Sequence, residues 1–154
     1  MRFLTSQEVT PTPAKDLESI PETTAAERAV ADLVPIDASL AEAQAALERV
    51  PLWFHTFALN GAGVYTPGIA RDHRYRLAAI PADLTGARVL DVGTFDGFYA
   101  FLAECRGAAR VVAVDNEQYV AWIRRRFGIE LEPGLGFRVI AELLGSGVDY
   151  RRVD

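Results

Sequence analysis

The spacing of hydrophobic positions changes along the chain and divides it into three segments. Residues 1–22 are mostly polar and are interrupted by prolines, a pattern typical of a flexible arm. Residues 23–86 begin with helical spacing and continue into an aromatic stretch, so we interpret them as a helical and aromatic lid segment. Residues 87–154 alternate short apolar runs with helical periodicity, which predicts a parallel α/β sheet with helices covering both faces.

Two capping boxes mark helix starts in the second segment. Thr24 precedes Glu27 by three residues and Ser39 precedes Glu42 by the same spacing, so each pair can satisfy backbone N–H groups at the start of a helix. Prolines further along the chain predict where the two helices end. Residues 52–76 then combine aromatic side chains with glycines and prolines, which predicts an irregular connector that lines a pocket or covers the edge of the domain.

The third segment predicts strand, helix, strand and helix in order, followed by one more helix and the start of a third strand. The apolar runs rich in β-branched residues predict buried strands, and glycines follow the first two expected helices. The expected elements, in chain order, lie at 88–92, 98–106, 111–115, 117–127, 137–144 and 148–153.

The residues with the clearest chemical pattern follow two of the predicted strands. Asp91-Val92-Gly93-Thr94-Phe95-Asp96-Gly97 ends the first strand, and Asp115-Asn116 ends the second. Ligands of open α/β sheets bind beyond the carboxyl ends of the strands. Gly93 permits close approach of a ligand, Gly97 permits tight packing of helix on strand, and the N–H groups of the turn are expected to face the ligand. Asp115 can accept hydrogen bonds from both hydroxyls of a ribose.

Two classes of cofactor fit this layout, and the charge of the turn separates them. A dinucleotide needs glycine where Phe95 stands and places its pyrophosphate where Asp96 stands. S-adenosylmethionine has no phosphate and carries a positive sulfonium and an amino group, which suit a turn flanked by Asp91 and Asp96. The sequence therefore favours S-adenosylmethionine. An NAD-dependent oxidoreductase and a non-catalytic or truncated Rossmann-like module are the alternatives.

Residues 89–99 resemble motif I of class I S-adenosylmethionine-dependent methyltransferases. With the upstream Trp53-Phe54-His55-Thr56, Tyr65-Thr66-Pro67-Gly68 and His73-Arg74-Tyr75-Arg76-Leu77 sequences, the chain is similar to the bacterial family related to the tRNA wobble-uridine (mo5U34) methyltransferase and its carboxymethyl-transferring relatives. The resemblance implies a Rossmann-like domain that transfers a one-carbon or carboxymethyl group from S-adenosylmethionine or its carboxylated form. A tRNA wobble uridine or a small molecule is the implied acceptor.

The resemblance also implies a set of site residues. Gly93, Thr94 and Asp96 are expected around the methionine part of the cofactor, Asp115 at the ribose, and Trp53 over the pocket from its N-terminal side. The implied cofactor-binding set consists of Trp53, Asp91, Gly93, Thr94, Asp96, Gly97, Asp115 and Asn116.

The chain departs from the family pattern in three ways. Phe95 stands where motif I usually has a small residue. No lysine follows Lys15, so a lysine partner for a carboxylated cofactor is missing and plain S-adenosylmethionine is expected. The later strands of the family's sheet have no counterpart after residue 153, and residues 87–154 are therefore expected to form the N-terminal half of the domain.

Composition narrows the remaining possibilities. A net charge of −5 argues against a large nucleic-acid-binding surface. The chain has neither a long apolar run nor the apolar core of a signal peptide, which predicts a cytoplasmic protein without a membrane span. One cysteine and two histidines without ligand spacing predict no metal site. Arg71, Arg74 and Arg76 form a basic group suited to an anionic substrate, and His73 and Arg74 are the candidate substrate contacts. The pattern identifies no catalytic residue.

Overall fold

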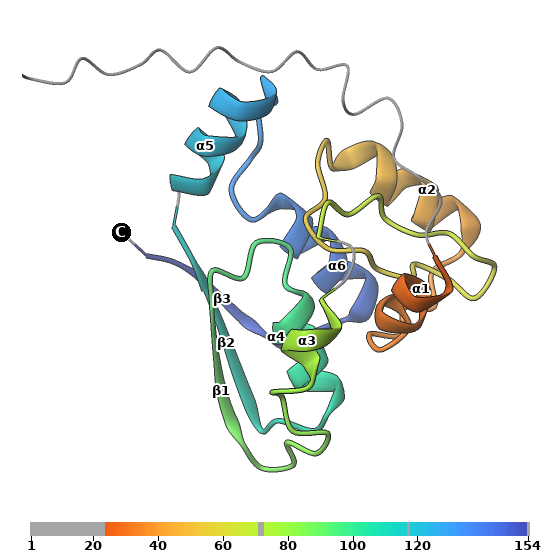
Figure 1. Cartoon of the computed structure of the whole chain (residues 1–154), viewed down its shortest axis with the longest axis vertical. Helices are drawn as coiled ribbons and strands as arrows, with labels where there is room; N and C mark the ends of the chain where they lie inside the picture. Colours follow the sequence, from red (N-terminus) through yellow and green to blue (C-terminus); the bar gives the residue numbers. More distant parts are fainter. Residues whose placement is uncertain (1–23, 71–72, 117, 154) are drawn as a thin grey trace, which may run out of the picture.

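The structure, a computed structural model, describes residues 24–70, 73–116 and 118–153. Within these residues a three-stranded parallel sheet is flanked by helices (Figure 1). The arrangement is α/β and is compatible with a Rossmann-like fold. The arm expected at 1–22 lies outside the described residues.

The N-terminal helices begin where the capping boxes predict. Helix α1 (Ala25–Ala31) has Thr24 as its N-cap, and helix α2 (Leu40–Arg49) has Ser39. In α2 the Ser39 N–H donates to Glu42 Oε2 at 2.9 Å, while the Glu42 N–H donates back to Ser39 Oγ at 3.3 Å. Both predicted helices are confirmed, and α2 ends directly before Val50 and Pro51.

The connector after α2 is irregular, as predicted, and folds back on itself through two isolated β-bridges. His55 pairs with Ala70, and Ala58 pairs with Tyr65. Gly68 makes this fold possible, because a Cβ at that position would lie 2.3 Å from the carbonyl carbon of His55. The short helix α3 (Arg74–Leu77) follows, and its single turn lies inside a stretch that the sequence pattern assigned to irregular structure.

The sheet consists of β1 (Arg88–Val92), β2 (Arg110–Asp115) and β3 (Asp149–Arg152) in that order. β1 pairs with β2 in parallel and β2 pairs with β3 in parallel, so the carboxyl ends of all three strands lie at the same edge of the sheet. Helix α4 (Phe98–Cys105) connects β1 to β2, while α5 (Gln118–Phe127) and α6 (Leu135–Leu144) lie between β2 and β3 in the chain. These elements confirm the predicted order.

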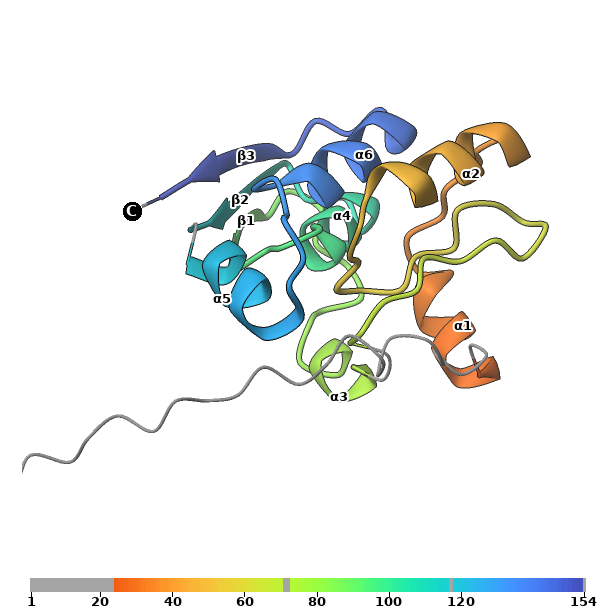
Figure 2. The same cartoon turned by 90° about the horizontal axis from the view of Figure 1, so that it is seen from above.

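The main hydrophobic core joins α2, α4 and α6, which Figure 2 shows on one side of the sheet. The rings of Phe101 and Phe137 stack with centroids 4.7 Å apart. Trp53 and Phe57 of the connector belong to the same core. Removing a side chain of this size from water contributes about 1.5–3 kcal/mol. The aromatic connector is therefore packed into the domain and shares its core.

The opposite face of β1 is exposed, whereas the sequence predicted that helices cover both faces of the sheet. Leu90 is 62% exposed and Val92 is 73% exposed, and neither belongs to a core cluster of the described residues. The apolar run predicted a strand buried on both faces, but the described elements cover only the face that carries Val89. No helix in the described ranges is long and apolar enough to cross a membrane.

Candidate functional site at the turn between β1 and α4

The turn between β1 and α4 has glycine at both ends, for two different reasons. Gly93 and Gly97 both have left-handed backbone angles, with φ of +76° and +89°. A Cβ at Gly97 would lie 2.5 Å from the ring of Phe101 and 2.6 Å from that of Phe137. A Cβ at Gly93 would meet nothing within 4 Å. Gly97 is thus required for packing, while the space over Gly93 is open to a ligand.

Phe95, the residue that departs from motif I, also has a left-handed backbone, with φ of +52°. This conformation costs a non-glycine residue about 1–2 kcal/mol. Its ring lies between Phe54, with centroids 5.0 Å apart, and Tyr119, with centroids 4.6 Å apart. These contacts place Phe95 between the connector and α5.

The N–H groups of Gly93, Thr94 and Phe95 are already bonded within the protein, contrary to the expectation that the N–H groups of the turn face a ligand. The N–H groups of Gly93 and Thr94 donate to the Val114 carbonyl at 2.9 and 3.2 Å. The Phe95 N–H donates to Asp115 Oδ2 at 2.8 Å. The physical reason is that the turn curls over the end of β2, whose carbonyl and carboxylate take these donors. A pyrophosphate needs free donors at this position.

Three carboxylates gather around the turn. Thr94 donates its hydroxyl to Asp91 Oδ2 at 2.6 Å, which orients the Asp91 side chain. Burial raises the pKa of Asp115, hydrogen bonds from the Phe95 and Asn116 N–H groups oppose the rise, and the charges of Asp91 and Asp96 add to it. Neighbouring carboxylates of like charge favour a cationic ligand at the turn.

The Asp96 side chain points into the protein and binds the connector. Its Oδ2 accepts the N–H groups of Phe54 at 2.7 Å and His55 at 2.8 Å, and its Oδ1 contacts His55 Nδ1. Asp96 is 1% exposed and Thr94 is 2% exposed. Two of the three residues expected around the methionine part of the cofactor, Thr94 and Asp96, therefore support the turn from behind. No signal in the sequence pairs His55 with Asp96, because 41 residues separate them.

Trp53 lies in the core, on the connector side of the turn. It is buried, and its ring packs edge-on against Phe57 with centroids 6.4 Å apart. Its Nε1 is buried and has no hydrogen-bond partner among the residues that the structure describes. The close approach of Gly136 of α6 to Trp53 and to Asp96 shows that α6 covers this region.

The two candidate substrate contacts differ in exposure. His73 is buried at the N-terminus of α3, and its Nδ1 is hydrogen-bonded to the Tyr99 hydroxyl at 2.7 Å. Its ring also lies beside that of His55, with centroids 5.3 Å apart. Arg74 is exposed on α3. The sequence analysis did not single out Tyr99, although it lies within the motif I segment.

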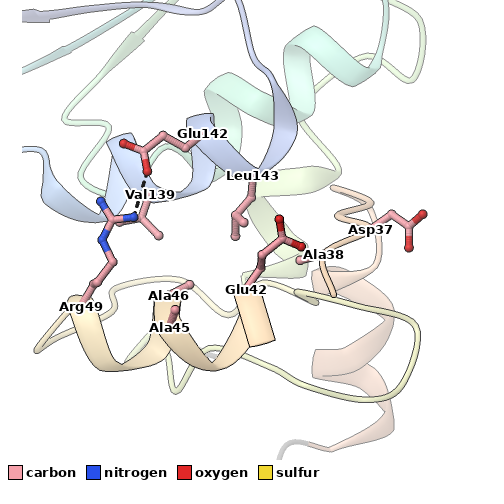
Figure 3. Close-up of a pocket in the computed structure, with 9 residues that line it drawn as sticks. All are labelled: Asp37, Ala38, Glu42, Ala45, Ala46, Arg49, Val139, Glu142 and Leu143. Carbon is pink, nitrogen blue, oxygen red and sulfur yellow. Dashed lines mark hydrogen bonds and ion pairs between the residues drawn. The ribbon is translucent and has the colours of Figure 1, made fainter. Parts of the chain in front are cut away.

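A separate pocket of about 320 Å³ lies between α2 and α6 (Figure 3). Arg49 and Glu142 point toward each other across it and form an ion pair of 2.9 Å, with side chains 51% and 59% exposed. Asp37 and Glu42 also line it. None of the sequence-predicted site residues contributes to this pocket, and an exposed ion pair of this kind adds little stability.

The structure thus brings Asp91, Gly93, Asp115 and Asn116 together at the carboxyl ends of β1 and β2. It places the other predicted cofactor contacts behind the turn or in the core. Within the described ranges no group of three or more His, Cys, Asp or Glu side chains is arranged to hold a metal ion. Comparison of the sequence with models of protein families gives no match, and comparison with curated proteins gives none either.

Proposed function

We propose that the chain binds S-adenosylmethionine at the turn between β1 and α4 and that it is the cofactor-binding part of a class I methyltransferase. The observation that supports this most directly is the cluster of Asp91, Asp96 and Asp115 around a turn whose first three N–H groups are already bonded within the protein. Such a turn favours a cation and offers little to a phosphate. The resemblance of residues 89–99 to motif I supplies the reaction class.

The residues at the carboxyl ends of β1 and β2 fit the parts of this cofactor. The open space over Gly93 admits the methionine part, and the half-buried Asp91 beside it is suited to the amino group. Each carboxylate oxygen of Asp115 accepts one backbone N–H, so each keeps capacity for a ribose hydroxyl. Asn116 follows directly and is partly exposed.

When bound, S-adenosylmethionine supplies a methyl group that its sulfonium already activates, so the protein contributes mainly position and exclusion of water. Asp91 is held in place by Thr94, and Asp115 is held by the backbone of the same turn. Asp96 fixes the turn against the connector. These contacts preorganise the turn before the ligand arrives.

The same features disfavour a nicotinamide-dependent oxidoreductase, because the pyrophosphate of its cofactor needs free N–H donors and is repelled by the carboxylates. The acceptor of the proposed reaction is a tRNA wobble uridine or a small molecule, and the net charge of −5 favours the small molecule.

The test is calorimetric titration of the whole chain with S-adenosylmethionine, S-adenosylhomocysteine and NAD. We expect saturable binding of the first two and none of NAD. Asp115→Asn should weaken binding strongly, because the amide offers one acceptor where the carboxylate offers two. Asp37→Asn, a change at an exposed carboxylate away from the turn, is the matched control. A folded, monodisperse chain that binds neither adenosyl compound would overturn the proposal.

A further inference from the structure

A pocket of about 480 Å³ lies between β1, the start of α4 and the segment that leads from α3 to β1. Its walls are mainly aliphatic, and they include Ile80, Leu84 and Val89. Its polar groups are the side chains of Arg76, Asp91 and Tyr99. Asp91 belongs also to the turn described above, so the pocket and the proposed cofactor site share a residue.

The Tyr99 hydroxyl is fixed by groups on both sides. It is hydrogen-bonded to Nδ1 of the buried His73 at 2.7 Å. Burial raises the pKa of Tyr99, a hydrogen bond from Arg76 opposes the rise, and the charge of Asp91 adds to it. A tyrosine oxygen has one proton and two acceptor positions, so a Tyr99 hydroxyl that donates to His73 Nδ1 and accepts from Arg76 keeps one acceptor position for a ligand.

Behind Tyr99, buried rings link the pocket to the turn. His73 lies beside His55, and His55 is bound to Asp96, whose carboxylate also holds the Phe54 N–H. His55 is 3% exposed, and its Nε2 has no hydrogen-bond partner within the described part of the chain. The Tyr99 hydroxyl therefore contacts the first of three buried polar side chains, His73, His55 and Asp96, which lie next to one another among aromatic rings.

Arg76 gives the pocket a positive charge at its rim. Its Nε donates to the Tyr75 hydroxyl at 2.9 Å, and its guanidinium lies 5.5 Å from the centre of the Tyr75 ring. Its partners in the described part of the chain are phenol groups, which do not neutralise the guanidinium. An apolar pocket with an exposed guanidinium at its rim suits a ligand that has an apolar body and an anionic group.

We infer that this pocket binds the methyl acceptor and that the acceptor is a small aromatic acid with a hydroxyl group, an inference that rests on the proposed function. The aliphatic walls take the ring, Arg76 pairs with the carboxylate, and the hydroxyl lies at Tyr99.

The transfer step balances with these groups. The acceptor hydroxyl oxygen forms a bond to the methyl carbon as the carbon–sulfur bond breaks, and the electron pair of that bond stays on sulfur, giving neutral S-adenosylhomocysteine. The proton of the acceptor hydroxyl passes to the Tyr99 oxygen, while Tyr99 gives its own proton to His73 Nδ1. This step uses the His73 tautomer that carries its proton on Nε2.

The test measures binding of 4-hydroxybenzoate to the whole chain by calorimetry, with S-adenosylhomocysteine present. The neutral analogue 4-hydroxybenzamide and the analogue without a hydroxyl, benzoate, are titrated in parallel. We expect 4-hydroxybenzoate to bind about tenfold more tightly than the amide, as one charge-assisted contact allows. Arg76→Gln should abolish this preference, whereas Arg125→Gln, at an exposed arginine of α5, should leave it unchanged. Tyr99→Phe should abolish the preference over benzoate.

The outcomes separate the pocket from the cofactor site. Binding of S-adenosylhomocysteine without any binding of 4-hydroxybenzoate would overturn the pocket assignment and leave the proposed function in place. Binding of 4-hydroxybenzoate that does not respond to Arg76→Gln would place the acid elsewhere and overturn the assignment as well. The chain could also bind the acid through Arg76 and yet bind no S-adenosylhomocysteine. That result would overturn the role of the acid as methyl acceptor. Thermal unfolding of each variant checks that it is folded.

Discussion

Asp96 and His55, 41 residues apart in sequence, form a buried contact that joins the glycine turn to the aromatic connector. The Asp96 carboxylate accepts the His55 N–H at 2.8 Å and also contacts the His55 ring nitrogen Nδ1. The Phe54 N–H completes the arrangement at 2.7 Å. The shape of the turn therefore depends on a segment that precedes the sheet by more than thirty residues.

Replacing Asp96 with asparagine should lower the free energy of unfolding by about 1.5–3 kcal/mol, the range for hydrogen bonds to a charged group. The amide oxygen can still accept the two backbone N–H groups, but the negative charge and the second acceptor oxygen, which contacts His55 Nδ1, are lost. Urea denaturation followed by circular dichroism measures the change. The exposed Asp37→Asn control should stay within about 0.5 kcal/mol of the parent chain. An Asp96→Asn chain of parental stability would contradict a structural role for this carboxylate.

Gly68→Ala should destabilise the chain by about 1–3 kcal/mol, because the added Cβ would lie 2.3 Å from the carbonyl carbon of His55. The connector would have to move away from its own backbone. Gly61→Ala is a matched control in the same connector, since a Cβ there meets nothing within 4 Å. Thermal unfolding of the two variants should differ clearly. Equal melting temperatures would show that the connector tolerates expansion at residue 68.

Asp115 should titrate above its ordinary pKa of 3.8, because burial and the neighbouring carboxylates raise the pKa of this group. The folded state then holds the proton more tightly than the unfolded state, so the contribution of Asp115 to stability is largest at acid pH. It falls as the pH rises from 3.8 through the folded-state pKa. Carbon-13 NMR of the carboxyl group measures this pKa. A midpoint at or below 3.8 would contradict the prediction.

Binding of S-adenosylmethionine should show the opposite trend. The ligand is cationic and uses ionised carboxylates, so its affinity should fall as the pH drops through the pKa of Asp115. Calorimetric titration across this range in the parent chain and in Asp115→Asn tests the assignment. The variant should bind weakly with a flatter pH dependence, and an unchanged dependence would exclude Asp115 as its source.

The exposed face of β1 should promote self-association. Leu90 and Val92 are both large, apolar and more than half exposed. The double variant Leu90→Thr/Val92→Thr places β-branched residues at both positions and should shift sedimentation toward the monomer without lowering the melting temperature. Val111→Thr, at a position 5% exposed in β2, should instead lower it. A parent chain that sediments as a monomer at all concentrations would contradict self-association through the exposed face of β1.

Local patterns predicted the fold well, because the signals for its elements lie within a few residues of each other. The capping box at Ser39 and Glu42 and the β-branched runs of β1 and β2 each specify an element without reference to the rest of the chain. The position of Gly93 in the open space at the end of β1 follows from the same local reasoning.

The side-chain environment of the site could not be predicted in the same way. Whether Asp96 faces a ligand or the protein depends on where His55 lies, and that is decided by packing between distant segments. The role of Tyr99 likewise depends on α3, a single turn within an irregular stretch. Contacts of this kind leave no periodicity in the sequence.

The burial of Trp53 gives the molecule an internal optical reporter. Trp53 is 2% exposed in the connector, whereas Trp122, the other tryptophan, is 46% exposed on α5. In a Trp122→Phe chain the fluorescence would come from the connector alone, with the blue-shifted emission of an indole in an apolar environment. Opening of the connector would then be visible as a red shift while circular dichroism still reported an intact sheet, so local opening and global unfolding could be timed separately in the same sample.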